Sequence, residues 1–253
     1  MKISFLLFLA SILVLSACKS SGSDNSFVSQ MEQAHQKENF LQHEAIQFNL
    51  MLVFGGKERL RGTLTLLTNS TKGRIDYEDG RRIIYDQETV YYSPEFEDPE
   101  RAEFAAYTWS YFFLMPYKLS DPGAQWEDYP EKELEEKTYE VQKLTFESGT
   151  GGSPDDWYIV YQDPETRLMH SAAYIVTANK SQAEAEEDPH AIQYSNYNEV
   201  EGIPIAQSWT FWGWQPVEGF TEELGHAELK RVRFTQLNQD FFDPLPGMSS
   251  TRQ

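Results

Sequence analysis

Side chains that could act in catalysis are numerous in this sequence, but their spacing does not match a known catalytic motif. No two of the five histidines stand four positions apart, the spacing that places two metal ligands on one helix face. Gly149-Thr150-Gly151-Gly152 is followed by Ser153-Pro154 rather than by a helix, which argues against a phosphate-binding loop. Carboxylates are so common, 40 in all, that any pair is weak evidence for acid–base hydrolysis. We therefore expect a protein that is not an enzyme and has no cofactor and no metal, although a metal site assembled from distant histidines and carboxylates stays open.

The single cysteine, Cys18, stands where a covalent modification is expected. Lys2 is followed by an uncharged run over residues 3–15, which is too short to span a bilayer and typical of a secretory signal. The run ends in Leu15-Ser16-Ala17-Cys18, which resembles a bacterial lipobox. That resemblance implies that residues 1–17 are a lipoprotein signal peptide and that the Cys18 sulfur carries a diacylglyceryl group. The alternative is a signal cleaved at the same point with Cys18 incidental.

An acylated Cys18 would attach the protein to a membrane while the rest of the chain stays in water. Residues 18–26 would then be the lipidated cysteine and a polar, flexible tether. We expect a lipid-anchored protein of the cell envelope, in the outer membrane, and leave open whether it faces the periplasm or the exterior.

The net charge of −19 excludes two further classes of partner. Nucleic acid binding needs clustered Lys and Arg, and so does electrostatic docking on anionic lipid. The aromatic content of 14% is too high for a disordered chain. We expect a folded acidic domain with no nucleic acid partner.

Aromatic side chains give the strongest indication of a binding site. Strand alternation sends Trp209 and Phe211 to one face of their strand and Trp212 and Trp214 to the other. A strand with two apolar faces is covered on the second face by a helix, or that face lines a cavity. The predicted ligand-binding residues are these four together with four from a helix, namely Phe104, Tyr107, Tyr111 and Phe112. Ordinary packing of a core between sheet and helix is the alternative.

These side chains are positioned by a mainly β domain. Alternating apolar and polar residues, separated by turns such as Asp79-Gly80, predict about eleven short strands in a curved antiparallel sheet. A nearly all-apolar helix from Asp98 to Pro116 interrupts them. The expected strands cover residues 46–54, 60–68, 73–77, 81–86, 89–93, 138–146, 157–162, 168–176, 192–197, 203–212 and 227–235.

The remaining segments lie at the two ends of this domain. Residues 27–38 show helical spacing of apolar side chains and predict a short N-terminal helix. Residues 241–253 contain prolines and predict a loose C-terminal tail. No linker divides the chain between them, so we expect a single domain over residues 27–240.

The order of these pieces resembles the LolA/LolB-like half-barrel lipoproteins, and more closely an uncharacterised family of Bacteroidota lipoproteins of that fold. The resemblance implies a curved sheet whose concave face is covered by helices and can hold acyl chains. It implies no catalysis and no cofactor. The phrases that carry it are Gly73-Arg74-Ile75-Asp76-Tyr77 with Asp79-Gly80, Thr108-Trp109 with Pro116-Tyr117-Lys118-Leu119, Asp121-Pro122-Gly123, Tyr158-Ile159-Val160-Tyr161 with Asp163-Pro164-Glu165-Thr166, and Ile203-Pro204-Ile205 with Ser208-Trp209.

Three hypotheses follow for the function. The first is a lipid-anchored envelope protein that binds a hydrophobic or amphipathic ligand, such as an acyl chain or a lipoprotein, in the half-barrel. The second is a packed accessory subunit of an envelope complex, which predicts a dry core and a large exposed apolar patch. The third is a hydrolase, which predicts a carboxylate or histidine with a strongly shifted pKa in a cleft.

Overall fold

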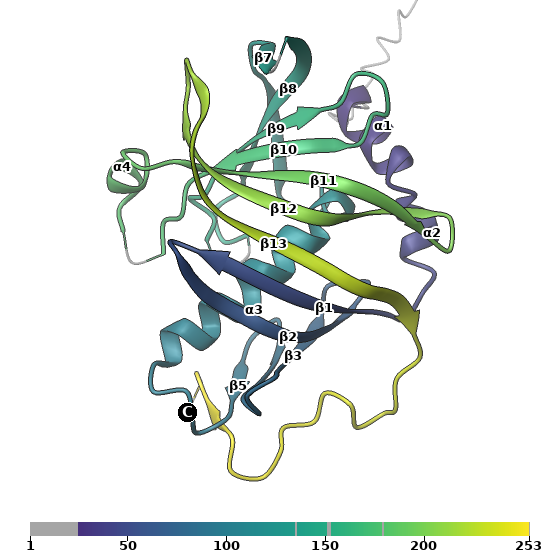
Figure 1. Ribbon diagram of the computed structural model, residues 1–253, viewed down its shortest axis with the longest axis vertical. Coiled ribbons are helices and arrows are strands. Elements are labelled where there is room, and N and C mark those ends of the chain that lie inside the picture. Colours follow the sequence, from purple (N-terminus) through teal and green to yellow (C-terminus); the bar gives the residue numbers. More distant parts are fainter. Residues whose placement is uncertain (1–24, 135, 151–152, 179, 253) are drawn as a thin grey trace, which may run out of the picture.

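The computed structural model describes residues 25–134, 136–150, 153–178 and 180–252, and most of them form one curved antiparallel sheet (Figure 1). The sheet is not closed into a barrel, which confirms the predicted half-barrel. The predicted signal peptide over residues 1–17, Cys18 and the tether up to residue 24 lie outside the described residues.

Two meanders make up the sheet, and they join where β1 pairs with β13. The first meander contains β1 (Ala45–Phe54), β2 (Lys57–Leu67), β3 (Lys72–Tyr77), β4 (Arg82–Asp86) and β5 (Val90–Tyr92). The second contains β8 (Lys137–Phe146), β9 (Tyr158–Gln162), β10 (Met169–Tyr174), β11 (His190–Val200), β12 (Ile203–Gln215) and β13 (Gly219–Thr235). These eleven strands correspond to the eleven predicted ones.

Three additional short strands lie at the margins of the sheet, which therefore has fourteen among the described residues. They are β6 (Ala124–Asp128), β7 (Lys132–Leu134) and β14 (Ser249–Ser250). Both β6 and β7 pair with β8, and β14 pairs with β5. Their sequences are charged or very short, so they lack the apolar alternation from which strands are predicted.

Helix α3 (Pro99–Leu114) connects β5, next to one edge of the sheet, to β6 at the other edge. A connection between opposite edges has to cross a face of the sheet, and α3 crosses the concave face (Figure 1). The helix begins as predicted, because the Asp98 side chain accepts a hydrogen bond from the Glu100 backbone N–H at 3.1 Å and Pro99 takes the first helical position. The 3₁₀ turn η1 (Met115–Tyr117) follows it.

Two short helices replace the single N-terminal helix predicted over residues 27–38. They are α1 (Ser26–Ala34) and α2 (Lys37–Phe40), and Gln36 between them has a left-handed backbone with φ of 55°. Both lie against the end of the sheet formed by β9 to β13 (Figure 1). The Phe40 ring stacks on Tyr117 of η1 at 3.7 Å, so these helices close the half-barrel where α3 ends.

The C-terminal segment is attached to the sheet, whereas the sequence predicts a loose tail. Besides the β14 pairing, the Thr251 backbone N–H donates to the Val90 carbonyl at 3.0 Å, and the Thr251 hydroxyl accepts from the Val90 N–H at 3.2 Å. Arg74 donates to the Phe241 carbonyl at 3.1 Å. These contacts join residues more than 150 positions apart, and no local sequence pattern reports them.

No helix among the described residues is long and apolar enough to cross a membrane. The described residues between 182 and 185 form the remaining short helix, α4 (Gln182–Ala185), on the surface loop before β11.

Candidate functional site

The eight aromatic residues predicted to line a ligand site fall into three groups in the structure. Trp209, Phe211 and Phe112 lie in the main core between α3 and the concave face, with Trp209 and Phe211 at most 1% exposed. The Phe211 ring lies 6.0 Å from Phe112 and 6.1 Å from Trp109, centroid to centroid. Trp109, which the sequence does not single out as a site residue, is also buried here. Its place on the apolar side of the helix is the signal that predicts this burial.

Trp212 and Trp214 lie on the opposite, convex face, as the strand alternation predicts. They do not face α3 or a cavity. The Trp214 indole N–H donates to the Tyr161 hydroxyl on β9 at 2.9 Å, although β9 and β12 are three strand spacings, about 14 Å, apart in a flat sheet.

The end of the β12–β13 hairpin therefore curls back over the convex face and covers it. The ladder between these strands shifts register between Phe211 and Trp212 and again before Trp214, and such irregularities bend a strand. The ring of Trp212 stacks on Phe220 of the same hairpin at 5.7 Å. Trp212 and Trp214 thus belong to a second core, separate from the concave face.

Phe104 lies on the outward side of α3, whereas Tyr107 and Tyr111 lie at its two flanks and pack against β4 and β9. Phe104 is 40% exposed, and the two tyrosines are half-buried. The buried side of the helix instead carries small residues and the larger rings, namely Ala102, Ala105, Ala106, Trp109, Ser110, Phe112 and Phe113. The helix is apolar nearly all round, so spacing alone does not identify its inner face.

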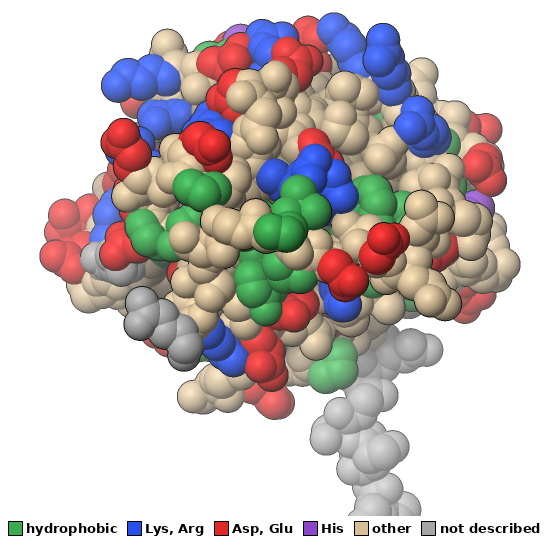
Figure 2. Space-filling view, turned by 90° about the horizontal axis from the view of Figure 1, so that it is seen from below, with side chains coloured by type: hydrophobic (Ala, Val, Ile, Leu, Met, Phe, Trp, Pro, Cys, Tyr) green, Lys and Arg blue, Asp and Glu red, His purple; other side chains and the backbone are tan. Residues whose placement is uncertain are grey.

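The lower face of the molecule includes the N-terminal end of α3, β5 and the C-terminal segment. Hydrophobic side chains gather near its centre, with acidic and basic side chains around them (Figure 2). Large exposed hydrophobic side chains among the described residues are spread over four segments and are Leu41, Phe104, Val217 and Leu245.

One side of α3 packs directly against the first meander. The Tyr85 hydroxyl on β4 donates to the Ser110 hydroxyl at 2.5 Å, and burial raises the pKa of Tyr85. The Tyr107 hydroxyl donates to the Asp86 carbonyl at 3.1 Å. These hydrogen bonds join the helix to β4.

The other side of α3 meets the second meander through a layer of aromatic rings. Tyr111 lies 5.5 Å from Tyr158 of β9, and Phe112 lies 4.9 Å from Tyr174 of β10. Among the residues that the structure describes, one hydrogen bond crosses this layer, from the Tyr194 hydroxyl to the Phe112 carbonyl at 2.8 Å. We call the layer formed by Trp109, Tyr111, Phe112, Tyr158, Tyr174 and Phe211 the aromatic seam.

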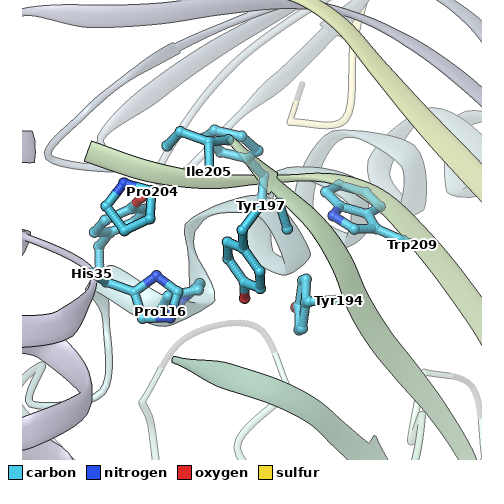
Figure 3. A pocket seen from close by; sticks show the side chains of 10 residues that line it. His35, Pro116, Tyr194, Tyr197, Pro204, Ile205 and Trp209 are labelled. Atoms are coloured by element: carbon cyan, nitrogen blue, oxygen red, sulfur yellow. The ribbon is translucent and has the colours of Figure 1, made fainter. Parts of the chain in front are cut away.

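A cavity of about 10 Å³ lies at the C-terminal end of α3, beside the seam (Figure 3). This volume holds about one water molecule. The concave face is thus closed and packed in this structure. The lining residues come from α1, the end of α3, η1, β11 and β12, and are His35, Phe113, Pro116, Tyr117, Tyr194, Tyr197, Pro204, Ile205, Ala206 and Trp209.

His35 is the fully buried histidine of this cavity. Its Nε2 accepts a hydrogen bond from the Met169 backbone N–H at 3.0 Å, so the proton of the neutral ring is on Nδ1. Burial lowers the pKa of the imidazole to about 3. Among the described residues, Nδ1 is the buried side-chain nitrogen or oxygen that has no hydrogen-bond partner.

Within the described residues, no group of three His, Cys, Asp or Glu side chains is arranged to hold a metal ion. His170 is mostly buried on the convex side, where burial lowers its pKa to about 4, and its ring contacts Tyr139 at 4.4 Å. The Asp163 carboxylate accepts from Lys137 and from the Thr166 backbone, and these bonds lower its pKa to about 2 although partial burial opposes them.

Comparisons with known proteins support the fold. A family of unknown function, DUF6503, matches residues 95–211, the part of the chain that runs from just before α3 into β12. No curated protein matches the sequence. A LolA superfamily protein from Nitrosomonas europaea is similar in structure, with a TM-score of 0.54, 10% identity, and coverage of 84% of this chain and 96% of that protein. The chain shares its fold with this LolA superfamily protein.

A second solved structure gives the same result. It is a putative outer membrane lipoprotein-sorting protein domain from Vibrio parahaemolyticus, with a TM-score of 0.54 and 10% identity over 86% of this chain and 97% of that one. At this identity, the likeness establishes the shared LolA-like architecture of a curved sheet crossed by a helix.

Proposed function

We propose that this protein is a non-catalytic, lipid-anchored envelope protein that binds a hydrophobic or amphipathic, acyl-containing ligand between α3 and the second meander. Anchoring through Cys18, a place in the outer membrane, and kinship with the uncharacterised Bacteroidota lipoproteins are parts of this proposal. The description of one structural neighbour as a lipoprotein-sorting protein favours a lipid or lipoprotein as the ligand class.

The observation that carries the proposal is the difference between the two sides of α3. The helix is hydrogen-bonded to β4 through Ser110 and Tyr107. On the other side, the seam contains rings that contact one another mainly through apolar surface and a single hydrogen bond. Separating the seam would break one hydrogen bond, that of the buried Tyr194 hydroxyl, whereas separating α3 from β4 would break those of both Tyr85 and Tyr107.

An acyl chain is the ligand that fits an opened seam. Both walls are apolar and aromatic, and acidic side chains elsewhere on the surface keep the protein in water. Each buried methylene contributes about 0.8 kcal/mol, so ten carbons contribute about 8 kcal/mol toward the cost of parting the rings. The closed packing seen here would then be the ligand-free state, and binding would move α3 together with the first meander.

The test is binding of 1-aminoanthracene, a fluorescent apolar probe, and its displacement by methyl laurate, in a chain that begins at Lys19. All contacts described above lie within residues 25–252, so this chain keeps them. Tyr111→Asp places a charge in the seam at a half-buried position and should weaken binding at least 10-fold. Val217→Asp, at an 87% exposed position in the turn between β12 and β13, is the matched control and should leave the affinity unchanged.

Equal affinity in wild type and folded Tyr111→Asp would contradict a site in the seam. Equal loss of binding in Val217→Asp would mean that the effect of an added charge is not specific to the seam.

The packed accessory subunit remains a second candidate, because the cavity beside the seam has room for about one water molecule. This hypothesis also predicts a large apolar docking patch, and hydrophobic side chains gather near the centre of the lower face (Figure 2). The two candidates differ in the binding of 1-aminoanthracene. A ligand-binding seam predicts that the probe binds and that Tyr111→Asp weakens its binding, whereas a permanently packed core predicts that the probe does not bind.

A further inference from the structure

The cavity at the end of α3 contains a hydrogen-bond donor without an acceptor. His35 Nδ1 carries the proton because Nε2 accepts from Met169, and Nδ1 is fully buried with no partner among the described residues. A buried donor in this condition destabilises the protein unless an acceptor reaches it. The side chain lines the cavity, so an acceptor placed there lies next to it (Figure 3).

The donor is uncharged at neutral pH, since burial holds the pKa of His35 at about 3. Apart from His35, the side chains that line the cavity are aromatic, aliphatic or proline, and none is a lysine or arginine. A carboxylate here would be buried without a compensating positive charge, which is costly. The surroundings therefore favour a neutral acceptor such as a carbonyl oxygen.

The cavity also adjoins the seam, because Tyr194 contributes to both. Trp209 and Tyr194 line it, and Tyr194 donates the hydrogen bond that crosses the seam to the Phe112 carbonyl. Phe113, next along α3, lines it as well. A chain lying along the opened seam would thus reach His35 with one of its ends.

We propose that the cavity beside His35 binds the carbonyl oxygen of an ester or amide at the head of the acyl ligand, with the Nδ1–H as donor. The inference rests on the proposed function and adds a specificity to it. The site selects neutral acyl esters and amides over free fatty acids, because it offers a hydrogen bond and no positive charge.

The rings of Tyr117 and Tyr197 lie 5.9 and 5.8 Å from the imidazole, both at steep angles. In the ligand-free protein, the Nδ1–H is therefore directed either at a ring face or at one buried water. The experiment has to distinguish these two arrangements from a hydrogen bond to a ligand carbonyl.

The first readout is the ¹⁵N–¹H signal of His35 Nδ1 in the chain from Lys19, recorded with 1-aminoanthracene, methyl laurate or laurate at pH 7.5. Methyl laurate should move this signal downfield, and 1-aminoanthracene, which has no carbonyl, should not. The second readout is displacement of 1-aminoanthracene. His35→Phe, which removes the donor, and Ala206→Leu, which fills the cavity and leaves His35 in place, should each weaken methyl laurate at least 10-fold with the probe affinity unchanged.

A shifted signal together with the selective loss in Ala206→Leu supports the subsite even if His35→Phe does not fold. The subsite is overturned, while the proposed function stands, if methyl laurate binds but leaves the His35 Nδ1 signal unmoved. It is also overturned if laurate binds as tightly as the ester. An unmoved signal would mean that the Nδ1–H is directed at one buried water or at a ring. No binding of the probe or of either laurate compound overturns the proposed function itself.

Discussion

Replacing His35 should remove a defined part of the pH dependence of stability. Its pKa is about 3 in the folded protein, against about 6.5 for an exposed histidine in the unfolded chain. As the pH falls below about 6.5, the unfolded chain takes up a proton that the folded chain does not. The free energy of unfolding therefore falls with decreasing pH, by up to about 1.4 kcal/mol per pH unit, until the folded pKa is reached.

Between pH 7.5 and 5.0 this term amounts to about 2 kcal/mol, or 30-fold in the unfolding equilibrium. His35→Gln keeps an acceptor for the Met169 N–H and cannot titrate, so its stability should fall about 2 kcal/mol less than that of the wild type over this range. His170 has a pKa lowered in the same direction, to about 4, and should supply a separate part of the slope that His35→Gln retains.

Urea unfolding at pH 7.5, 6.5, 5.5 and 5.0 measures both slopes, with the far-ultraviolet circular dichroism at pH 7.5 as the test that His35→Gln is folded. Identical slopes in wild type and variant would refute the reasoning, because they would mean that the His35 imidazole is accessible to protons in the folded state.

Three further substitutions test the packing. Phe211→Ala should cost about 3–5 kcal/mol because the ring is fully buried, whereas Phe104→Ala, at a position 40% exposed, should cost under about 1 kcal/mol; equal costs in urea unfolding would contradict the assigned faces of α3 and β12. Asp98→Ala should cost about 1 kcal/mol through loss of the helix cap, measured against Glu97→Ala as the neighbouring control, and no difference would argue against the cap. Thr251→Val should cost about 1 kcal/mol, since it removes the acceptor of the Val90 N–H, and an unchanged stability would mean that the C-terminal segment is detached in solution.

The strands and the crossing helix could be predicted because their signals are local. Alternation of apolar residues locates eleven strands, and Asp98 followed by Pro99 locates the start of α3. Strand alternation also separates Trp209 and Phe211 from Trp212 and Trp214.

The side-chain arrangement at the site could not be predicted, because it depends on contacts between distant segments. Trp214 is covered by the end of its own β12–β13 hairpin, which bends where the strand pairing shifts register. No residue pattern predicts these register shifts. The inner face of α3 is defined by Tyr85 and Tyr158 on opposite meanders, so the outward position of Phe104 is not visible from helical spacing. His35 has no neighbour in sequence that marks it, since its partner Met169 lies 134 positions away.

The proposed function requires that the aromatic seam opens to hold an acyl ligand. Native mass spectrometry of the chain from Lys19, incubated with a lipid extract of its own cells' envelope, is the first measurement to make. We expect a reproducible excess mass that dissociates as a neutral acyl species and is lost in Tyr111→Asp but retained in Val217→Asp. A mass equal to that of the chain alone, with no uptake of added phospholipid or acylated peptide, would contradict it and favour the packed accessory subunit.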